Sequence, residues 1–417
     1  MIRSSFFRQS AWMLFASMAG GGLLALVHRI AARMDASGEY GLFTTVLNSM
    51  TALTWPALGL AAAFMQMTAT ATTDEAKRSV SAAAKRVAGG MACYWVLICL
   101  AMFVGKDWVM TTFKMTSGLA LVWLAPTLLL QLLSPIAQGI VQGRQDFFTA
   151  GWSAIIGGAG RLSITWLAVT LIGASAGWAI CGVFFGLLAG FIPLVIASRH
   201  IWRLPAGTFA FSSWLRDAGP LTGGLAASAF LFSLDQWAAR EFLPPAGNDL
   251  YGAAGTVGRV VMWVSAPLVV VMFPKIIGAA AAGEDRRILF HAVGATLAVA
   301  ASAAIACTLF PLVPLLALQG KTLAASAAPL VPAYVWCLIP LTLANVLLNN
   351  LLARKRYGVV IPLIVVVLGY WMALRRFNGS PKEIILTLGG AATVALLVTA
   401  FYTWRGGKRS HAAINPA

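Results

Sequence analysis

Charged residues are scarce in this chain of 417 residues. Only 10% of the residues are Asp, Glu, Lys or Arg, and 59% are hydrophobic, whereas an ordinary soluble domain has roughly 25% charged residues. A chain with so little charge cannot cover the surface of a water-soluble globule, which excludes soluble enzymes and soluble binding modules. Strand-type alternation is missing from the apolar stretches as well, which excludes a membrane β-barrel.

Cysteine is rare and is not arranged for chemistry. The five cysteines lie within apolar stretches, with neither CxxC spacing nor neighbouring histidines. No disulfide, zinc or redox site is predicted from this pattern. We therefore expect no metal, no cofactor and no catalytic residue in this chain.

Long apolar stretches recur from one end of the chain to the other. Each holds about 20 residues, enough to cross roughly 30 Å of hydrocarbon as an α-helix. The loops between them are short, and no convincing cleavage site follows the first stretch, so we expect it to be a permanent span and not a signal peptide. The fold class predicted is an all-α membrane protein with twelve transmembrane helices, at 9–28, 42–67, 87–105, 119–141, 150–172, 174–198, 213–234, 250–274, 288–310, 328–353, 358–374 and 384–404.

The positive charge of the chain has a topological explanation. Its formal net charge is +17, but the Lys and Arg residues lie in loops beside apolar helices, so nucleic acid is not an expected partner. Most of them fall in alternate loops on one side, and the positive-inside rule places that side in the cytoplasm. We predict a multi-pass protein of the bacterial inner membrane with both termini cytoplasmic.

Two arginines lie within the predicted spans, and acidic residues are nearly absent from them. Arg161 falls in span 5 and Arg259 in span 8, whereas only Asp235 lies at the edge of a span. An arginine at the bilayer centre costs at least roughly 2.5–3.5 kcal/mol unless it faces water or a partner. No carboxylate is an obvious permanent partner for Arg259, so we expect it in a wet cavity. For Arg161 both a structural tie to carbonyl or amide groups and a cavity role stay open.

The arginines together indicate an anionic cargo. Arg29 and Arg240 lie at the outer ends of spans 1 and 7, and with Arg161 and Arg259 they would line an interior of positive potential. Phosphate or pyrophosphate suits the planar fork of a guanidinium group.

An internal repeat relates the two halves of the chain. A constant displacement of 211 residues aligns polar, aromatic, glycine and proline positions in three separate parts of each half, and it places Asn48 of span 2 at the position of Arg259. We therefore predict two tandem six-helix lobes, 1–205 and 206–417, in the parallel-repeat arrangement of alternating-access transporters, with the substrate site between them. The matched residues are Arg29 and Arg240, Tyr40-Gly41 and Tyr251-Gly252, Pro56 and Pro267, Asp74 and Asp285, Gln138 and Asn349, and Arg144 and Lys355.

Three segments resemble the oligosaccharide flippases of polysaccharide biosynthesis, namely RIAARMDASGEYGLFTTVLNSMTAL, QGIVQGRQDFF and NDLYGAAGTVGRVVMWVSAPLVVVMFPKI. The resemblance implies kinship with the multidrug and toxin extrusion (MATE) exporters and with the flippase of the lipid-linked peptidoglycan precursor. It implies a MATE-like V of two lobes around a cationic cavity, with undecaprenyl-pyrophosphate oligosaccharide as cargo and membrane lipids and polysaccharide assembly proteins as partners. By the same resemblance, Arg29 or Arg33 matches the basic end of helix 1, and Arg259 a basic cavity position on helix 8. Arg161 matches no motif.

Three other functions remain as alternatives. A multidrug exporter of the same fold is disfavoured by the lack of a buried carboxylate in the first six helices. A major-facilitator transporter is disfavoured by the loop TTDEAKRSVSAAAKR, which lacks the usual Gly-Asp-Arg-type motif. A membrane-embedded polysaccharide polymerase or glycosyltransferase is disfavoured by short outer loops without paired carboxylates, so we expect no enzyme.

Overall fold

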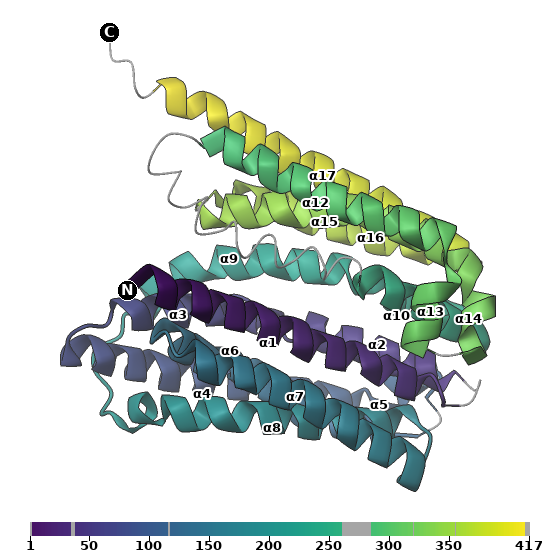
Figure 1. Ribbon diagram of the computed structural model, residues 1–417, viewed down its shortest axis with the longest axis horizontal. Helices are drawn as coiled ribbons and strands as arrows, with labels where there is room; N and C mark the ends of the chain where they lie inside the picture. Colours follow the sequence, from purple (N-terminus) through teal and green to yellow (C-terminus); the bar gives the residue numbers. More distant parts are fainter. Residues whose placement is uncertain are drawn as a thin grey trace. The chain divides into compact units, whose positions relative to one another are not determined.

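The computed structural model describes residues 2–34, 38–115, 117–260, 285–319, 321–354 and 356–412, and these residues form helices and short connections without a strand (Figure 1). The chain divides into two compact units, Met1–Thr222 and Gly223–Ala417, which we call unit 1 and unit 2. This division falls inside α9 (Phe211–Leu231). The division expected from the repeat, at 205/206, lies in the segment just before that helix.

Unit 1 contains a bundle of long helices. Within it α7 packs along both α1 and α8, and α6 packs along α8 and α3. Its elements are α1 (Ile2–Ala31), α2 (Glu39–Leu53), η1 (Trp55–Ala57), α3 (Leu60–Thr70), α4 (Asp74–Val104), α5 (Lys106–Thr112), α6 (Leu119–Gly143), α7 (Phe147–Leu167), η2 (Ala168–Ile172), α8 (Ala176–Arg203) and the first part of α9.

Unit 2 begins within α9 and is again helical. Its α15 packs against α12 and α17, and α16 packs against α17. The elements after α9 are α10 (Leu234–Phe242), a helix of which residues 245–260 are described, α12 (Asp285–Leu309), α13 (Leu312–Gln319), α14 (Lys321–Ala327), η3 (Ala328–Leu330), α15 (Val331–Ala353), η4 (Tyr357–Val359), α16 (Val360–Arg376) and α17 (Pro381–Ala412).

Eight helices among the described residues are long and apolar enough to cross a membrane, or nine if one bent pair counts as a single span. The predicted class, an all-helical multi-pass protein, agrees with this result, but the count of twelve crossings is not established. Part of the predicted span 250–274 lies outside the described residues, together with Pro267.

The bent pair corresponds to the predicted span 42–67. Its two parts, Glu39–Leu53 and Trp55–Thr70, meet at an angle of 51°. Pro56 lies at this break, inside η1. A proline removes a helical hydrogen bond and clashes with the preceding turn, which is why the helix bends here. The bend therefore lies where Pro56 permits one.

Small residues explain the close packing of α7 on α8. Gly182, Gly186 and Gly190 recur at every fourth position of α8 and so share one face. A Cβ atom at Gly190 would lie 2.8 Å from the carbonyl oxygen of Ser153, and one at Gly186 would overlap the backbone and stem of Arg161. Ser153 Oγ donates a hydrogen bond of 2.6 Å to the Gly190 carbonyl. Such stripes let membrane helices approach closely, where packing rather than the hydrophobic effect drives association.

A buried carboxylate joins α2 to α8. Glu39, only 7% exposed, accepts a hydrogen bond of 2.7 Å from the backbone N–H of Ala176, the first residue of α8. The carboxylate thereby satisfies an amide that has no partner within its own helix and lies at the positive end of the helix dipole. The expectation that the first half lacks a buried carboxylate is therefore wrong, because α2 begins before the predicted span and carries Glu39 into the protein.

Candidate functional site

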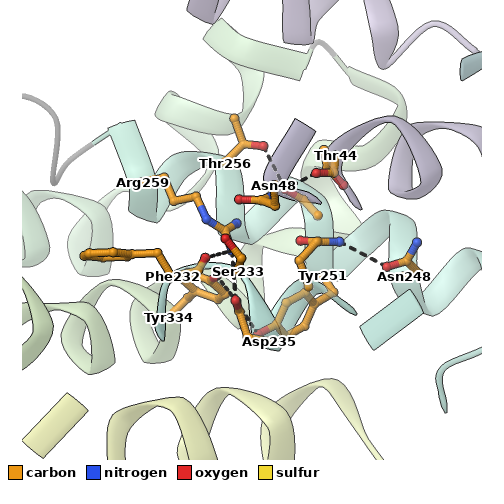
Figure 2. Close-up of polar contacts among 12 residues, drawn as sticks. Thr44, Asn48, Phe232, Ser233, Asp235, Asn248, Tyr251, Thr256, Arg259 and Tyr334 are labelled. Atoms are coloured by element: carbon orange, nitrogen blue, oxygen red, sulfur yellow. Dashed lines mark hydrogen bonds and ion pairs between the residues drawn. The ribbon is translucent and has the colours of Figure 1, made fainter. Parts of the chain in front are cut away.

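A helix break in unit 2 prepares the main polar cluster. The helix α9 ends at Leu231 and α10 begins at Leu234, so Phe232 and Ser233 form a turn between them. Ser233 Oγ donates a hydrogen bond of 2.8 Å to the Ala229 carbonyl. The Phe232 carbonyl instead accepts a hydrogen bond from outside its helix, from Nη2 of Arg259 at 3.2 Å (Figure 2). Broken helices of this kind are tolerated within a membrane where other groups satisfy the released backbone atoms.

Asp235 lies in the first turn of α10 and is completely buried. Its carboxylate accepts hydrogen bonds from the hydroxyl groups of Tyr251, at 2.9 Å, and of Tyr334. It also forms an ion pair with Arg259, whose Nη2 lies 3.1 Å from Oδ1 and 3.0 Å from Oδ2. The positive end of the α10 dipole adds to these contacts. Four favourable interactions thus converge on one buried negative charge.

Arg259 is fixed as firmly as its partner. Its side chain belongs to the helix of residues 245–260, is 9% exposed, and has its Cζ atom 5.6 Å from the centre of the Tyr334 ring. Gly255 and Gly258 make room for this ring, since a Cβ atom at Gly258 would lie 2.5 Å from Cδ1 of Tyr334. We call Asp235, Tyr251, Arg259 and Tyr334 the ion-pair cluster; Figure 2 shows all four side chains converging.

The expectation that Arg259 has no permanent carboxylate partner is wrong. Asp235 looked like a residue at the edge of span 7, but the break after Leu231 begins a new helix there, and this helix presents its first turn to Arg259. The two residues are 24 positions apart on different helices, so no periodicity in the sequence links them. The available signal was that one half of the chain holds both a deep arginine and a carboxylate at a span edge.

Arg161 has a different environment. It lies near the middle of the span formed by Phe147–Ile172, with its stem against Gly186 of α8. Its Nε atom is buried without a hydrogen-bond partner. In the part of the chain that the structure describes, Arg161 makes neither a hydrogen bond nor an ion pair. The structural tie to carbonyl or amide groups, one of the two roles left open for this residue, therefore has no support there.

The remaining predicted site residues are distributed over both units. In unit 1, Arg29 and Arg33 are exposed at the end of α1, and Asn48 is half-buried with its Nδ2 donating to the Thr44 carbonyl at 2.8 Å. In unit 2, Arg240 is buried in the last turn of α10, at 2% exposure. The Asn48 side chain therefore forms a hydrogen bond within its own helix, whereas the side chain of its counterpart Arg259 bonds to Asp235 of a neighbouring helix. That these residues line one cavity with the two deep arginines stays a prediction.

No family model matches the sequence, and no curated protein is similar to it in sequence. Solved structures with the same fold are found. A multidrug resistance MATE family transporter of the MOP superfamily, in an inward-facing conformation, has a TM-score of 0.70 at 12% identity, covering 97% of this chain and 100% of its own. The lipid II flippase MurJ has a TM-score of 0.72 at 14% identity, covering 95% of this chain and 87% of its own.

A mutant of the Vibrio cholerae MATE transporter VcmN is also similar, with a TM-score of 0.65 at 11% identity over 97% of this chain and 96% of that one. At such identities the likeness concerns the fold. The apolar helices and these neighbours agree with one another: the chain is a helical, multi-pass membrane protein with the fold that MATE transporters and the lipid II flippase share.

Proposed function

We propose that this protein is a flippase that carries undecaprenyl-pyrophosphate-linked oligosaccharide from the cytoplasmic to the periplasmic leaflet by alternating access. The fold supports a transporter of the MOP superfamily, because solved structures of a multidrug resistance MATE transporter and of the lipid II flippase MurJ are similar to this chain. Three segments that resemble oligosaccharide flippases support the choice of cargo.

The single observation that carries the proposal is that Arg161 has no ion-pair partner among the described residues. Its guanidinium group lies deep in an apolar helix and makes no ion pair within the described residues. A charge held there without compensation is unfavourable by a few kcal/mol. An anionic head group that visits the site would compensate it, and a diphosphate can accept the paired N–H donors of a guanidinium fork. Arg259 is less able to bind the diphosphate, because its ion pair with Asp235 already neutralises its charge.

The physical task of the protein follows from the cargo. A diphosphate with attached sugars cannot cross hydrocarbon unaided, so the protein replaces its hydration with polar groups while the polyprenyl tail stays in lipid. Exposure of the binding site first to one leaflet and then to the other completes transport without covalent chemistry.

Reconstitution tests the proposal directly. The protein in vesicles should move a fluorescent undecaprenyl-pyrophosphate oligosaccharide from one leaflet to the other, and Arg161→Gln should lower the initial rate at least tenfold. Arg161→Lys keeps a point charge without the fork and should be intermediate. Arg376→Gln, which removes an exposed arginine at the end of α16, is the matched control and should not change the rate.

Deletion in the native cell gives an independent test. Loss of the protein should leave intact lipid-linked repeat units on the cytoplasmic leaflet and abolish surface polysaccharide. Normal delivery of these units to the periplasm in the deletion strain would refute the flippase function. Delivery of the units without their polymerisation would favour the alternative of a membrane-embedded polymerase.

A multidrug exporter is the second candidate, and the buried carboxylate of Asp235 favours it. A cation exporter commonly uses a carboxylate inside the bundle to bind its substrate or a coupling ion, and Asp235 is such a group. Expression in a drug-sensitive strain separates the two functions. Protection against cationic dyes that is kept in Arg161→Gln, but lost in Asp235→Asn when this variant is present in the membrane at the level of the parent protein, would support the exporter.

A further inference from the structure

A hollow of about 650 Å³ lies at one end of unit 1, away from Arg161. It forms where α6 ends at Gly143, α7 begins at Phe147 and α8 approaches its end at Arg203. Thr149, the residue of α7 that lines it, precedes Arg161 by twelve positions, or about 18 Å along a helix. This hollow is therefore distinct from the site proposed for the cargo.

Among the described residues that line the hollow, Arg144, Arg199 and His200 are basic and none is acidic. The nearby Asp146 is not one of the lining residues; its Oδ1 accepts a hydrogen bond of 3.1 Å from the Thr149 amide and so caps α7. An anion entering the hollow would therefore meet basic groups and the threonine hydroxyl rather than a competing carboxylate.

Arg144 is held in place before any ligand binds. Its Nη1 atom donates to the Ala197 carbonyl at 3.3 Å and lies 3.1 Å from Nδ1 of His200. Nδ1 of His200 also lies 3.0 Å from the Ala197 carbonyl oxygen, so the guanidinium group, the imidazole and this carbonyl form one polar cluster. Fixing a long side chain in advance lowers the entropy lost on binding.

The other wall of the hollow is apolar and continues into the membrane. Pro193 and Ile196 of α8 line it, and Ile196 is 55% exposed and Ile192, one turn earlier, 50% exposed on a helix apolar enough to span a bilayer. On α7 the neighbouring Phe148 is 65% exposed and stacks on Trp12 with ring centres 5.6 Å apart. Aromatic side chains gather at the head-group level of a membrane, so these rings mark the interface beside the basic groups.

We propose that this hollow binds the head group of an anionic phospholipid, with the phosphate between Arg144, Arg199 and His200 and the acyl chains along the exposed face of α8. Basic pockets between transmembrane helices attract anionic lipid head groups. The apolar wall distinguishes a lipid from a free anion, because only a lipid gains from covering Ile192 and Ile196. The inference is independent of which cargo the protein carries.

Lipid binding by the purified full chain tests the inference. Native mass spectrometry in a neutral detergent should show bound dioleoylphosphatidylglycerol at concentrations where dioleoylphosphatidylcholine does not bind. The double variant Arg144→Gln/Arg199→Gln should weaken binding of the anionic lipid at least tenfold and leave the midpoint of thermal unfolding in phosphatidylcholine micelles unchanged. Arg144→Lys/Arg199→Lys, which keeps both charges, should retain most of the binding.

The matched control is Arg375→Gln/Arg376→Gln, which removes two neighbouring exposed arginines from the end of α16. An equal loss of binding in this control would mean that general surface charge attracts the lipid, and the inference would be wrong. Undiminished binding by Arg144→Gln/Arg199→Gln would also overturn it. Full displacement of the lipid by millimolar inorganic phosphate would overturn it too, since the hollow would then select the anion alone.

Discussion

Replacing Asp235 by Asn removes one charge from the ion-pair cluster and changes almost nothing in its shape. The Asn side chain still offers an oxygen to the hydroxyl groups of Tyr251 and Tyr334, so their hydrogen bonds can survive. Arg259, at 9% exposure, is left with the Phe232 carbonyl at 3.2 Å and the Tyr334 ring as its favourable contacts. Breaking a buried ion pair from one side typically costs 3–5 kcal/mol, and we expect a loss of about this size in unit 2.

The reverse change, Arg259→Gln, should cost less. Asp235 then keeps both tyrosine hydroxyls and the positive end of the α10 dipole, and hydrogen bonds to a charged group contribute roughly 1.5–3 kcal/mol each. We expect a loss of about 1–3 kcal/mol. The double variant has no unpaired charge, so its loss should be smaller than the sum of the single losses by roughly 2–3 kcal/mol.

Thermal unfolding of the four proteins in one detergent, followed by tryptophan fluorescence, measures this cycle. A loss of 1 kcal/mol lowers the midpoint by roughly 2–4 °C for a unit of 150–250 residues. The reasoning predicts the order Asp235→Asn below Arg259→Gln, with the double variant between the two single variants. Additive losses, or a double variant less stable than both, would show that the pair is not coupled. A double variant that is stable but inactive in transport would show that the charges also serve function.

Two further predictions concern unit 1, and a third concerns the orientation of the chain in the membrane. Gly186→Leu should separate α7 from α8 and lower the unfolding midpoint by several degrees, because no space for a side chain exists beside Arg161, and an unchanged midpoint would contradict the packing. Glu39→Ala should cost about 1 kcal/mol through loss of the α8 cap, measurable as a lower midpoint, whereas Glu39→Gln keeps an acceptor and should recover part of it. In a Cys93→Ser background, a membrane-impermeant thiol reagent applied from the periplasmic side should label Lys382→Cys and not Thr72→Cys, and the reverse pattern would refute the predicted orientation.

Composition and periodicity were enough to predict the fold class of this protein, a helical, multi-pass membrane protein. An apolar stretch long enough to cross a bilayer forms a transmembrane helix, because in lipid the backbone of each stretch must satisfy its own hydrogen bonds. The kink at Pro56 was predictable for a similar local reason, because a proline lacks the amide hydrogen that a helix needs. Two arginines stood out by cost alone, because an arginine inside a membrane is unfavourable unless its surroundings compensate its charge.

Contacts between helices that lie far apart in the sequence could not be predicted from composition and periodicity. Glu39 reaches Ala176 across 137 positions, and Asp235 reaches Tyr334 across 99. Local patterns carry no signal for these distances, and the sequence therefore suggested carboxylates outside the membrane where the structure buries them. The basic hollow at Arg144 was missed for the same reason, since Arg144 and His200 come from different helices.

The sequence by itself determined a helical, multi-pass membrane protein with rare and costly charges, because burial of apolar stretches and the price of an intramembrane arginine depend on residue type alone. Only the tertiary structure decided which of those charges is compensated. It paired Arg259 with Asp235 through a helix break and left Arg161 without an ion pair among the described residues. The physical reason is that compensation depends on the few ångströms between side chains of different helices, and packing sets that distance.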